Sequence, residues 1–272
     1  MDLNKLITLA YQEDIPNTDI TTDSLKIESL IGKAHLVAKE DLVLSGIEIF
    51  EACLQHIDPE LKIKTYFKNS DVILNQQSIA LIEGNMIALL KAERVALNFL
   101  GHLTGIASLT SCFVKTIEDS NCKILDTRKT TPLYRDLEKQ AVRDGGASNH
   151  RRDLSSAILI KENHIQVAGS IEKALRSAKE TNADFIEIEL KNEKEIKIAL
   201  PFEPTRILLD NMNIAQLKKA VSIIPRSIET EASGNMTLDR VKEVAETGVN
   251  FISVGAITHS APTADISLLF DW

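Results

Sequence analysis

Apolar and polar positions follow two different patterns along this chain, and the change comes near residue 84. The chain opens with apolar side chains at helical spacing from Leu3 to Tyr11, and a second helical pattern covers residues 47–56. Short runs in which apolar and polar residues alternate lie at residues 33–39, 61–67 and 78–83, as in half-buried strands. This first part of the chain therefore predicts a small α+β sandwich.

A long helical pattern follows. From Met86 to about Ile117, apolar residues recur every three or four positions. Gly101 and Gly105 interrupt this pattern, and glycine weakens a helix. The segment predicts one or two long helices that link two halves of the chain.

Beyond this helix a single unit repeats, in which a short apolar run ends in a polar residue and a helical stretch follows. The six runs are KILDTR (123–128), AILIKENH (157–164), FIEIEL (185–190), RILLDN (206–211), IETEASGN (228–235) and FISVGA (251–256). The starts of the last four runs lie 21, 22 and 23 residues apart, which is the length of a βα unit with short loops. Consecutive βα units predict a parallel sheet.

Six or more such units close most readily into a βα barrel, and a doubly wound open sheet is the alternative. No GxGxxG or GxxxxGK[ST] motif opens any of the helices, so the pattern favours the barrel. The predicted fold class is α/β, with an N-terminal α+β sandwich domain (1–112), a parallel βα barrel domain (113–264) and a C-terminal tail (265–272).

Composition narrows the class of function. The 272 residues include 31 Lys and Arg against 39 Asp and Glu, a net charge of −8, which disfavours a general nucleic-acid or anionic-membrane surface. The three cysteines are odd in number and lack CxxC spacing, which argues against a disulfide framework or a structural zinc site. The first residues do not resemble an export signal, and the sequence has no run of about 18 uncharged apolar residues of the kind that a membrane-spanning helix needs. We expect a cytoplasmic protein.

Polar residues end all six predicted strands. In a βα barrel these ends converge on one mouth, where binding and chemistry occur. The first two strands supply cations, the middle two carboxylates and the last two small residues, as follows: Asp126 to Lys129; Lys161 to His164; Glu187 and Glu189; Asp210 and Asn211; Glu231 and Ser233 to Asn235; Gly255. Each of these could instead be a solvated loop residue, but the same ending on all six strands favours a site.

The charge pattern predicts two anion sites. Residues 128–164 hold eight Lys or Arg and five acids, and Arg128, Arg151 and Lys161 suit a ligand with several negative groups. Loops after the late strands of a βα barrel often bind phosphate, and the SGN and VGA segments lie in such loops. The need for a tight turn explains the glycines in these segments equally well. Glu189 and Asp210 suit Mg²⁺ or sugar hydroxyls, or simple pairing with Lys191 or Arg206. The pattern suggests an enzyme that joins an anionic small molecule to a phosphosugar.

Several motifs in one order resemble the quinolinate phosphoribosyltransferase family, also called nicotinate-nucleotide pyrophosphorylase (carboxylating). They are ERVALNFLGHLTGIA (93–107), DTRKTTP (126–132), LEKQAVRDGGASNHR (137–151), LIKENH (159–164), EIE (187–189), LDNM (209–212), EASGN (231–235) and SVGAITHS (253–260). The resemblance implies an incomplete barrel, a homo-oligomer built from dimers, and synthesis of nicotinate mononucleotide, CO2 and pyrophosphate from quinolinate and phosphoribosyl pyrophosphate with Mg²⁺, on the de novo route to NAD. By the same analogy the C-terminal tail packs on the N-terminal domain.

The resemblance also implies roles for single residues. Quinolinate would meet Thr127, Arg128, Lys129, His150, Arg151 and Lys161, with Arg94 donated by a partner subunit. The ribose and metal would face Glu189 and Asp210, and the phosphate would lie at Ser233, Gly234, Asn235 and Val254, Gly255, Ala256. Lys129, Lys161, Glu189 and Asp210 would act in catalysis. The chain departs from the family pattern at Leu133 (usually Gly), Gln140, Ala147 and Glu162.

Two other functions fit parts of the pattern. A Schiff-base aldolase would also present a strand-end lysine such as Lys161. A phosphoribosyltransferase-like protein linked to metal uptake would share the fold, but NHR followed by LIKENH argues against it. Phosphoribosyltransferases of the other fold type place two consecutive acids after a strand, whereas RILLDN offers one acid and an Asn.

Overall fold

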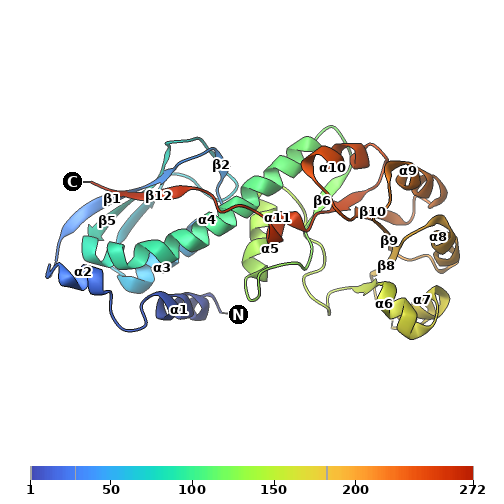
Figure 1. Ribbon diagram of the computed structural model, residues 1–272, viewed down its shortest axis with the longest axis horizontal. Helices are drawn as coiled ribbons and strands as arrows, with labels where there is room; N and C mark the ends of the chain where they lie inside the picture. Colours follow the sequence, from blue (N-terminus) through green and yellow to red (C-terminus); the bar gives the residue numbers. More distant parts are fainter. Residues whose placement is uncertain (1, 28, 182, 272) are drawn as a thin grey trace. The chain divides into compact units, whose positions relative to one another are not determined.

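The computed structural model describes residues 2–27, 29–181 and 183–271 (Figure 1). The chain divides into two units, which we describe separately. Unit 1 comprises Met1–Leu109, Asp136–Gly146 and Ala261–Trp272, and unit 2 comprises Thr110–Arg135 and Ala147–Ser260.

Unit 1 is built on a four-stranded antiparallel sheet with the order β12-β1-β5-β3. Its strands are β1 (Ile31–Ala38), β3 (Lys62–Thr65), β5 (Ser78–Asn85) and β12 (Ile266–Phe270), and β2 (Leu42–Val43) pairs with β4 (Val72–Ile73) beside it. Alternate side chains of β1, at Ala34, Leu36 and Ala38, are fully buried, so one face of this sheet is covered. The predicted sandwich domain is confirmed as an antiparallel sheet with helices.

Three helices pack together in unit 1. They are α1 (Leu3–Asp14), α3 (Ile47–Ile57) and α4 (Met86–Thr116), and the short α2 (Ile20–Ser24) follows α1. The hydroxyl of Tyr11 lies 3.0 Å from the carbonyl oxygen of Cys53 in α3 and 3.1 Å from that of Ala92 in α4. Its one proton therefore ties α1 to both neighbours inside the core.

Helix α4 runs without a break through the two glycines that interrupt its apolar pattern. A Cβ atom on Gly105 would lie 1.9 Å from the carbonyl oxygen of Pro262, and one on Gly101 would lie 2.8 Å from Thr263. The two glycines therefore do not end the helix. They leave room for the backbone before β12 to pass close to it. Helix α4 also has the length and apolar composition of a membrane span, but most of that stretch is buried, as in the core helix of a soluble protein.

The division into units differs from the sequence-based boundaries at 112/113 and 264/265. Helix α5 (Arg135–Asp144) groups almost entirely with unit 1, although we assigned it to the barrel. The reason is a set of polar contacts: Ser45 donates to Asp144 (2.7 Å), and His102 lies 2.8 Å from the buried Glu138. Residues 266–270 of the tail form β12, which pairs with β1.

Unit 2 contains a six-stranded parallel sheet with the order β6-β11-β10-β9-β8-β7. The strands are β6 (Lys123–Leu125), β7 (Ile158–Ile160), β8 (Ile186–Leu190), β9 (Arg206–Asp210), β10 (Glu229–Ser233) and β11 (Phe251–Ser253), and each lies within one of the six predicted runs. From β7 to β11 every strand pairs with the next in sequence, so the order never reverses. A doubly wound sheet requires a reversal, so that alternative is wrong.

The helices of unit 2 lie outside the strands (Figure 1). They are α6 (Glu162–Ala168), α7 (Ile171–Lys179), α8 (Glu193–Ala199), α9 (Ile214–Ile223), α10 (Leu238–Ala245) and α11 (Ala256–His259). Right-handed crossovers between sequential strands put all helices on one face, and the other face must curve inward on itself. Strands β6 and β7 do not pair with each other, so the barrel is incomplete.

Candidate active site

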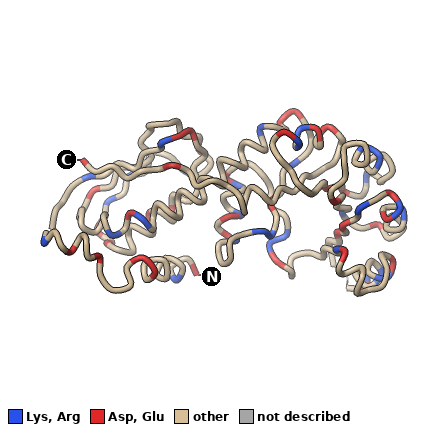
Figure 2. Tube along the Cα trace, in the orientation of Figure 1, with Lys and Arg blue, Asp and Glu red and all other residues tan. Residues whose placement is uncertain are grey.

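Charged side chains form ordered rows on the inner face of the unit 2 sheet. Strand neighbours Glu187 and Arg206 are in register, as are Glu189 and Leu208, and Arg206 also lies opposite Glu229. Because side chains alternate between the two faces of a strand, Glu187 and Glu189 share the face that carries Arg206, Leu208 and Asp210. Figure 2 shows charged positions of both signs among these strands. The interior of a βα barrel is usually apolar, so these charged rows are unusual. They make polar contacts with one another or with a ligand.

A cavity of about 810 Å³ opens at the carboxyl ends of these strands. This volume suits a site for small molecules. Most of the predicted site residues line it: Thr127, Arg128, Lys129, His150, Arg151, Lys161, Glu189, Asp210, Ser233, Gly234, Asn235, Gly255 and Ala256. The sequence separates these residues by up to 129 positions, and the parallel strand order brings them to one mouth.

Two predicted residues lie outside this lining. Val254 is 1% exposed and its backbone N–H donates to the carbonyl oxygen of Leu125 (2.9 Å), so its side chain packs in the sheet. The predicted Val254–Ala256 turn therefore lines the cavity through Gly255 and Ala256. Arg94 lies on helix α4 in unit 1, where its side chain is exposed.

The cavity has a cationic end. The Nε atom of Arg128 is buried and has no hydrogen-bond partner among the residues that the structure describes. Burial and the nearby charge of Arg128 hold the pKa of Arg151 below its usual value, and Nη1 of Arg151 donates to the carbonyl oxygen of Ala157 (3.0 Å). Two guanidinium groups that repel each other around an unpartnered donor make a ready place for an anion.

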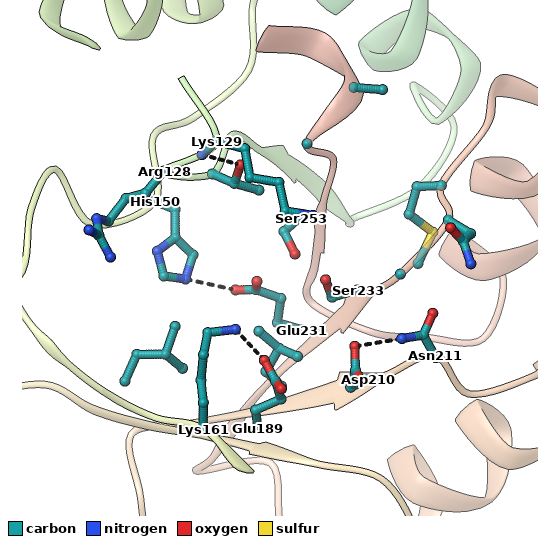
Figure 3. Close-up of a pocket in the computed structure, with 18 of the residues that line it drawn as sticks. Arg128, Lys129, His150, Lys161, Glu189, Asp210, Asn211, Glu231, Ser233 and Ser253 are labelled. Atoms are coloured by element: carbon teal, nitrogen blue, oxygen red, sulfur yellow. Dashed lines mark hydrogen bonds and ion pairs between the residues drawn. The ribbon is translucent and has the colours of Figure 1, made fainter. Parts of the chain in front are cut away.

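Lys161 lies at the junction of β7 and α6. It is the N-cap of α6, and its backbone N–H donates to Nδ1 of His164 (2.9 Å), which fixes the start of the helix. Its ammonium group contacts the carboxylate of Glu189, as Figure 3 shows. This ion pair links the cationic end of the cavity to the carboxylates beside it.

The carboxylates come from neighbouring strands. Glu189 is inside the cavity, with 14% of its side chain exposed, and Asp210 ends strand β9. The Oδ1 atom of Asp210 accepts a hydrogen bond from the side-chain amide of Asn211 (3.0 Å) (Figure 3). Asp210 forms no ion pair among the residues that the structure describes, so it is available to a ligand.

The far end of the cavity is formed by tight turns. Gly234 has a φ of 104°, and Asn211 and Asn235 also take up left-handed conformations with φ of 53° and 49°. A Cβ atom on Gly234 would lie 2.1 Å from Oδ1 of Asn211. A glycine is therefore required here, and its backbone is open to a close approach by a ligand.

His259 is a lining residue that the sequence analysis missed. It lies at the end of α11, and a Cβ atom on Gly255 would be 3.1 Å from its Nε2. Residues four apart on a helix share a face, so the spacing from Gly255 was the available signal. Ser253, Met236 and Thr237 also line the cavity and were not predicted, whereas Asn211 and Glu231 were expected at the mouth without an assigned role.

Leu133, one of the departures from the family pattern, has a φ of 70° and is 69% exposed. A left-handed conformation is costly for leucine and natural for glycine. The left-handed backbone conformation therefore explains why glycine is usual at this position. This chain keeps the same turn with a strained leucine.

The comparisons with known proteins cover nearly the whole chain. The model of the quinolinate phosphoribosyl transferase C-terminal domain matches residues 106–269, and that of the N-terminal domain matches residues 19–104. Together these matches place both parts of the chain in one family.

Individual relatives agree with these matches. The chain is 38% identical to a chloroplastic nicotinate-nucleotide pyrophosphorylase (carboxylating) of Arabidopsis thaliana, over 99% of this chain and 83% of the relative. It is 37% identical to a probable nicotinate-nucleotide pyrophosphorylase (carboxylating) of Bacillus subtilis, over 98% and 93%. The solved structure of the Francisella tularensis nicotinate-nucleotide pyrophosphorylase superposes with a TM-score of 0.95 at 36% identity, over 99% and 96%. The chain therefore belongs to the quinolinate phosphoribosyltransferase family of enzymes.

Proposed function

We propose that the cavity of unit 2 is where this chain carries out the quinolinate phosphoribosyltransferase reaction of NAD biosynthesis. In that reaction quinolinate and phosphoribosyl pyrophosphate give nicotinate mononucleotide, CO2 and pyrophosphate. The observation that carries the proposal is that Arg128 and Arg151 both line the cavity and that the buried Nε donor of Arg128 has no partner among the described residues. A planar dianion with two adjacent carboxylates is the ligand that such a pair accommodates.

At this cationic end we assign quinolinate to Arg128, Arg151 and Lys161, with Thr127, Lys129 and His150 around them. Clamping both carboxylates orients the pyridine nitrogen toward the ribose, and orientation removes much of the entropic part of the barrier. The strongest contacts belong on the 3-carboxylate, which stays in the product, because a tight grip on the 2-carboxylate would oppose its loss.

At the far end we assign the 5′-phosphate to the turns Ser233–Asn235 and Gly255–Ala256, and the ribose to Glu189 and Asp210. The pyridine nitrogen forms a bond to C1 of the ribose as the bond from C1 to pyrophosphate breaks. The C1 atom then carries positive charge in the transition state, which the two carboxylates stabilise. The bond to the 2-carboxylate breaks next, and its electron pair stays on C2, where the adjacent positively charged nitrogen stabilises it. A proton from solvent then takes the place of CO2 at that carbon.

Glu189 and Asp210 also fit Mg²⁺, because Mg²⁺ prefers carboxylate oxygens and keeps several waters. Among the described residues Asp210 forms no ion pair, whereas Glu189 contacts Lys161, so the donor set suits a metal ion that arrives with the pyrophosphate of the substrate. When bound, the metal would neutralise charge that develops on the leaving pyrophosphate.

Replacement of Asp210 tests this assignment. We expect Asp210→Asn to lower kcat by about 30- to 100-fold, or roughly 2–3 kcal/mol of transition-state stabilisation, because the amide has no negative charge. The KM for quinolinate is expected to stay the same, since Asp210 lies away from the cationic end. A variant with wild-type kcat at saturating Mg²⁺ would remove Asp210 from this role.

The overall activity is tested by incubating the protein with both substrates and Mg²⁺ and measuring nicotinate mononucleotide and CO2 together. Equal amounts of the two products are expected, with nicotinate inactive as acceptor because it lacks the 2-carboxylate. Product without CO2, or a stable adduct of a carbonyl compound on Lys161 after borohydride reduction, would favour the related phosphoribosyltransferase or the aldolase instead.

We further propose that the enzyme works as a homo-oligomer in which Arg94 reaches the cavity of a partner subunit, and that it resides in the cytoplasm. The support for the first point is that the side chain of Arg94 is exposed on helix α4. Arg94→Ala and Arg151→Ala are each expected to have a strongly reduced kcat/KM for quinolinate and to regain part of it when unfolded together and refolded as mixed oligomers. Mixed oligomers without this gain would show that both residues serve the same chain.

A further inference from the structure

A buried cluster of ionisable groups lies beneath the cationic end of the cavity. His150 Nε2 is 2.9 Å from Oε2 of Glu187 and 3.6 Å from Oε2 of Glu231, and the three side chains are 9%, 1% and 0% exposed. Figure 3 shows the imidazole directed toward Glu231. Glu187 does not line the cavity, so any effect it has on a ligand passes through a neighbour.

One hydrogen bond fixes where the proton of His150 lies. The backbone N–H of Arg151 donates to Nδ1 of His150 (2.8 Å), so Nδ1 carries a lone pair and the ring proton is on Nε2. This proton points at the two carboxylates. Both oxygens of Glu187 are buried and accept no hydrogen bond from the residues that the structure describes, so the 2.9 Å approach of His150 Nε2 is an electrostatic contact.

The same hydrogen bond argues against a metal ion in this cluster, although the ligand atoms of the three residues lie within 4.8 Å of one another. A metal bound to Nε2 would need a lone pair there and the ring proton on Nδ1, opposite the N–H of Arg151. In addition, the guanidinium of Arg206 lies 3.0 Å from Oε2 of Glu231 and already balances one negative charge.

The orientation of His150 bears directly on the quinolinate end of the cavity. The backbone N–H of His150 donates to the buried Asp126 (2.7 Å), and the next residue in the chain is Arg151. If the ring proton moved to Nδ1, two N–H groups would face each other at Arg151, and the segment would have to shift. A shift of this segment would displace the guanidinium group of Arg151.

We propose that Glu187 is a positioning residue that, together with Glu231, holds His150 as the neutral Nε2–H tautomer and thereby fixes Arg151 for the binding of quinolinate. The kinetic part of this inference rests on the proposed function, whereas the tautomer does not. His150 then forms a wall of the site without adding to its positive charge.

Electrostatics support a neutral imidazole. Burial lowers the pKa of His150, and the charged groups that face it are Glu231 and Asp126, which raise the pKa, and Arg206 and Arg151, which lower it. Burial is the largest of these causes, so the charged ring is disfavoured despite the acids below it.

The tautomer is tested in the wild-type protein by NMR of ¹⁵N-labelled histidine, with His150→Gln used to assign the signal among six histidines. At pH 7 we expect Nε2 to carry the proton and Nδ1 to carry none. A ring protonated on Nδ1, or on both nitrogens, would overturn the proposal whether or not the protein turns over quinolinate.

The kinetic role is tested with Glu187→Leu, Glu187→Gln and the control Glu229→Gln. Glu229 also pairs with Arg206 (2.7 Å) but is 43% exposed and does not face His150. We expect Glu187→Leu to raise the KM for quinolinate about tenfold or more with an unchanged KM for phosphoribosyl pyrophosphate, because His150 loses its close carboxylate contact and Arg151 loses its fixed position. Glu187→Gln keeps an acceptor oxygen and is expected to restore most of the affinity.

Thermal unfolding of each variant separates this effect from general loss of structure. The proposal is contradicted if Glu187→Leu alters both KM values equally, if Glu187→Gln is as impaired as Glu187→Leu, or if Glu229→Gln raises the KM for quinolinate to the same extent. If Glu187→Leu does not fold, the test uses the NMR signal of His150 in Glu187→Gln. Loss of the proton from Nε2 of His150 in that variant contradicts the proposal.

Discussion

Arg151→Ala is expected to lower kcat/KM for quinolinate by roughly 200- to 1000-fold, because it removes about two charge-assisted hydrogen bonds worth about 3–4 kcal/mol together. Most of the loss should appear in KM, since the guanidinium binds a carboxylate in the ground state as well as in the transition state. Steady-state kinetics with quinolinate varied at saturating phosphoribosyl pyrophosphate measures the effect.

The matched control is Arg152→Ala. Arg152 follows directly in the chain, but its side chain is 59% exposed, pairs with Asp153 (2.9 Å) and does not line the cavity. It should leave the KM for quinolinate unchanged. Equal effects of the two substitutions would mean that net charge near the cavity, rather than a specific clamp, attracts the substrate.

Gly234→Ala is expected to lower kcat/KM for phosphoribosyl pyrophosphate by about 300-fold or more, since displacing a bound group by about 1 Å already costs roughly 100-fold. The added Cβ atom would lie 2.1 Å from Oδ1 and 3.1 Å from Cα of Asn211, so the turn must move. The φ of 104° adds backbone strain for any residue other than glycine.

Gly248→Ala separates strain from displacement. Gly248 has a φ of 88°, but a Cβ atom there meets only Cγ1 of Val221 at 3.6 Å, and the residue is outside the cavity lining. It should lower the unfolding temperature modestly and leave both KM values unchanged. A Gly234→Ala enzyme with a normal KM for phosphoribosyl pyrophosphate would exclude the turn from phosphate binding.

The sequence predicted the sheet of unit 2 well because each strand is a short apolar run closed by a polar residue, and periodicity of this kind is a local property. All six strands lie within the predicted runs, the regular spacing of the βα units predicted a parallel sheet, and the lack of a glycine-rich phosphate motif favoured the barrel. The lining residues at the strand ends followed from that arrangement.

Other features depend on packing that the sequence pattern does not show. Helix α5 belongs with unit 1 through contacts such as Ser45–Asp144, which are 99 positions apart. Glu187 and Arg206 looked like alternating strand residues, and only the strand register reveals that they form a charged interior row with Glu231. Val254 entered the predicted site through the family resemblance, and only the structure shows that its side chain is buried.

A crystal structure of the protein with bound quinolinate tests the central claim most directly. The account predicts that the two carboxylates occupy the cationic end of the unit 2 cavity, with Nε of Arg128 and the guanidinium of Arg151 both within hydrogen-bond distance of carboxylate oxygens. Quinolinate bound at another place, or bound in this cavity with both guanidinium groups turned away from it, would contradict the account.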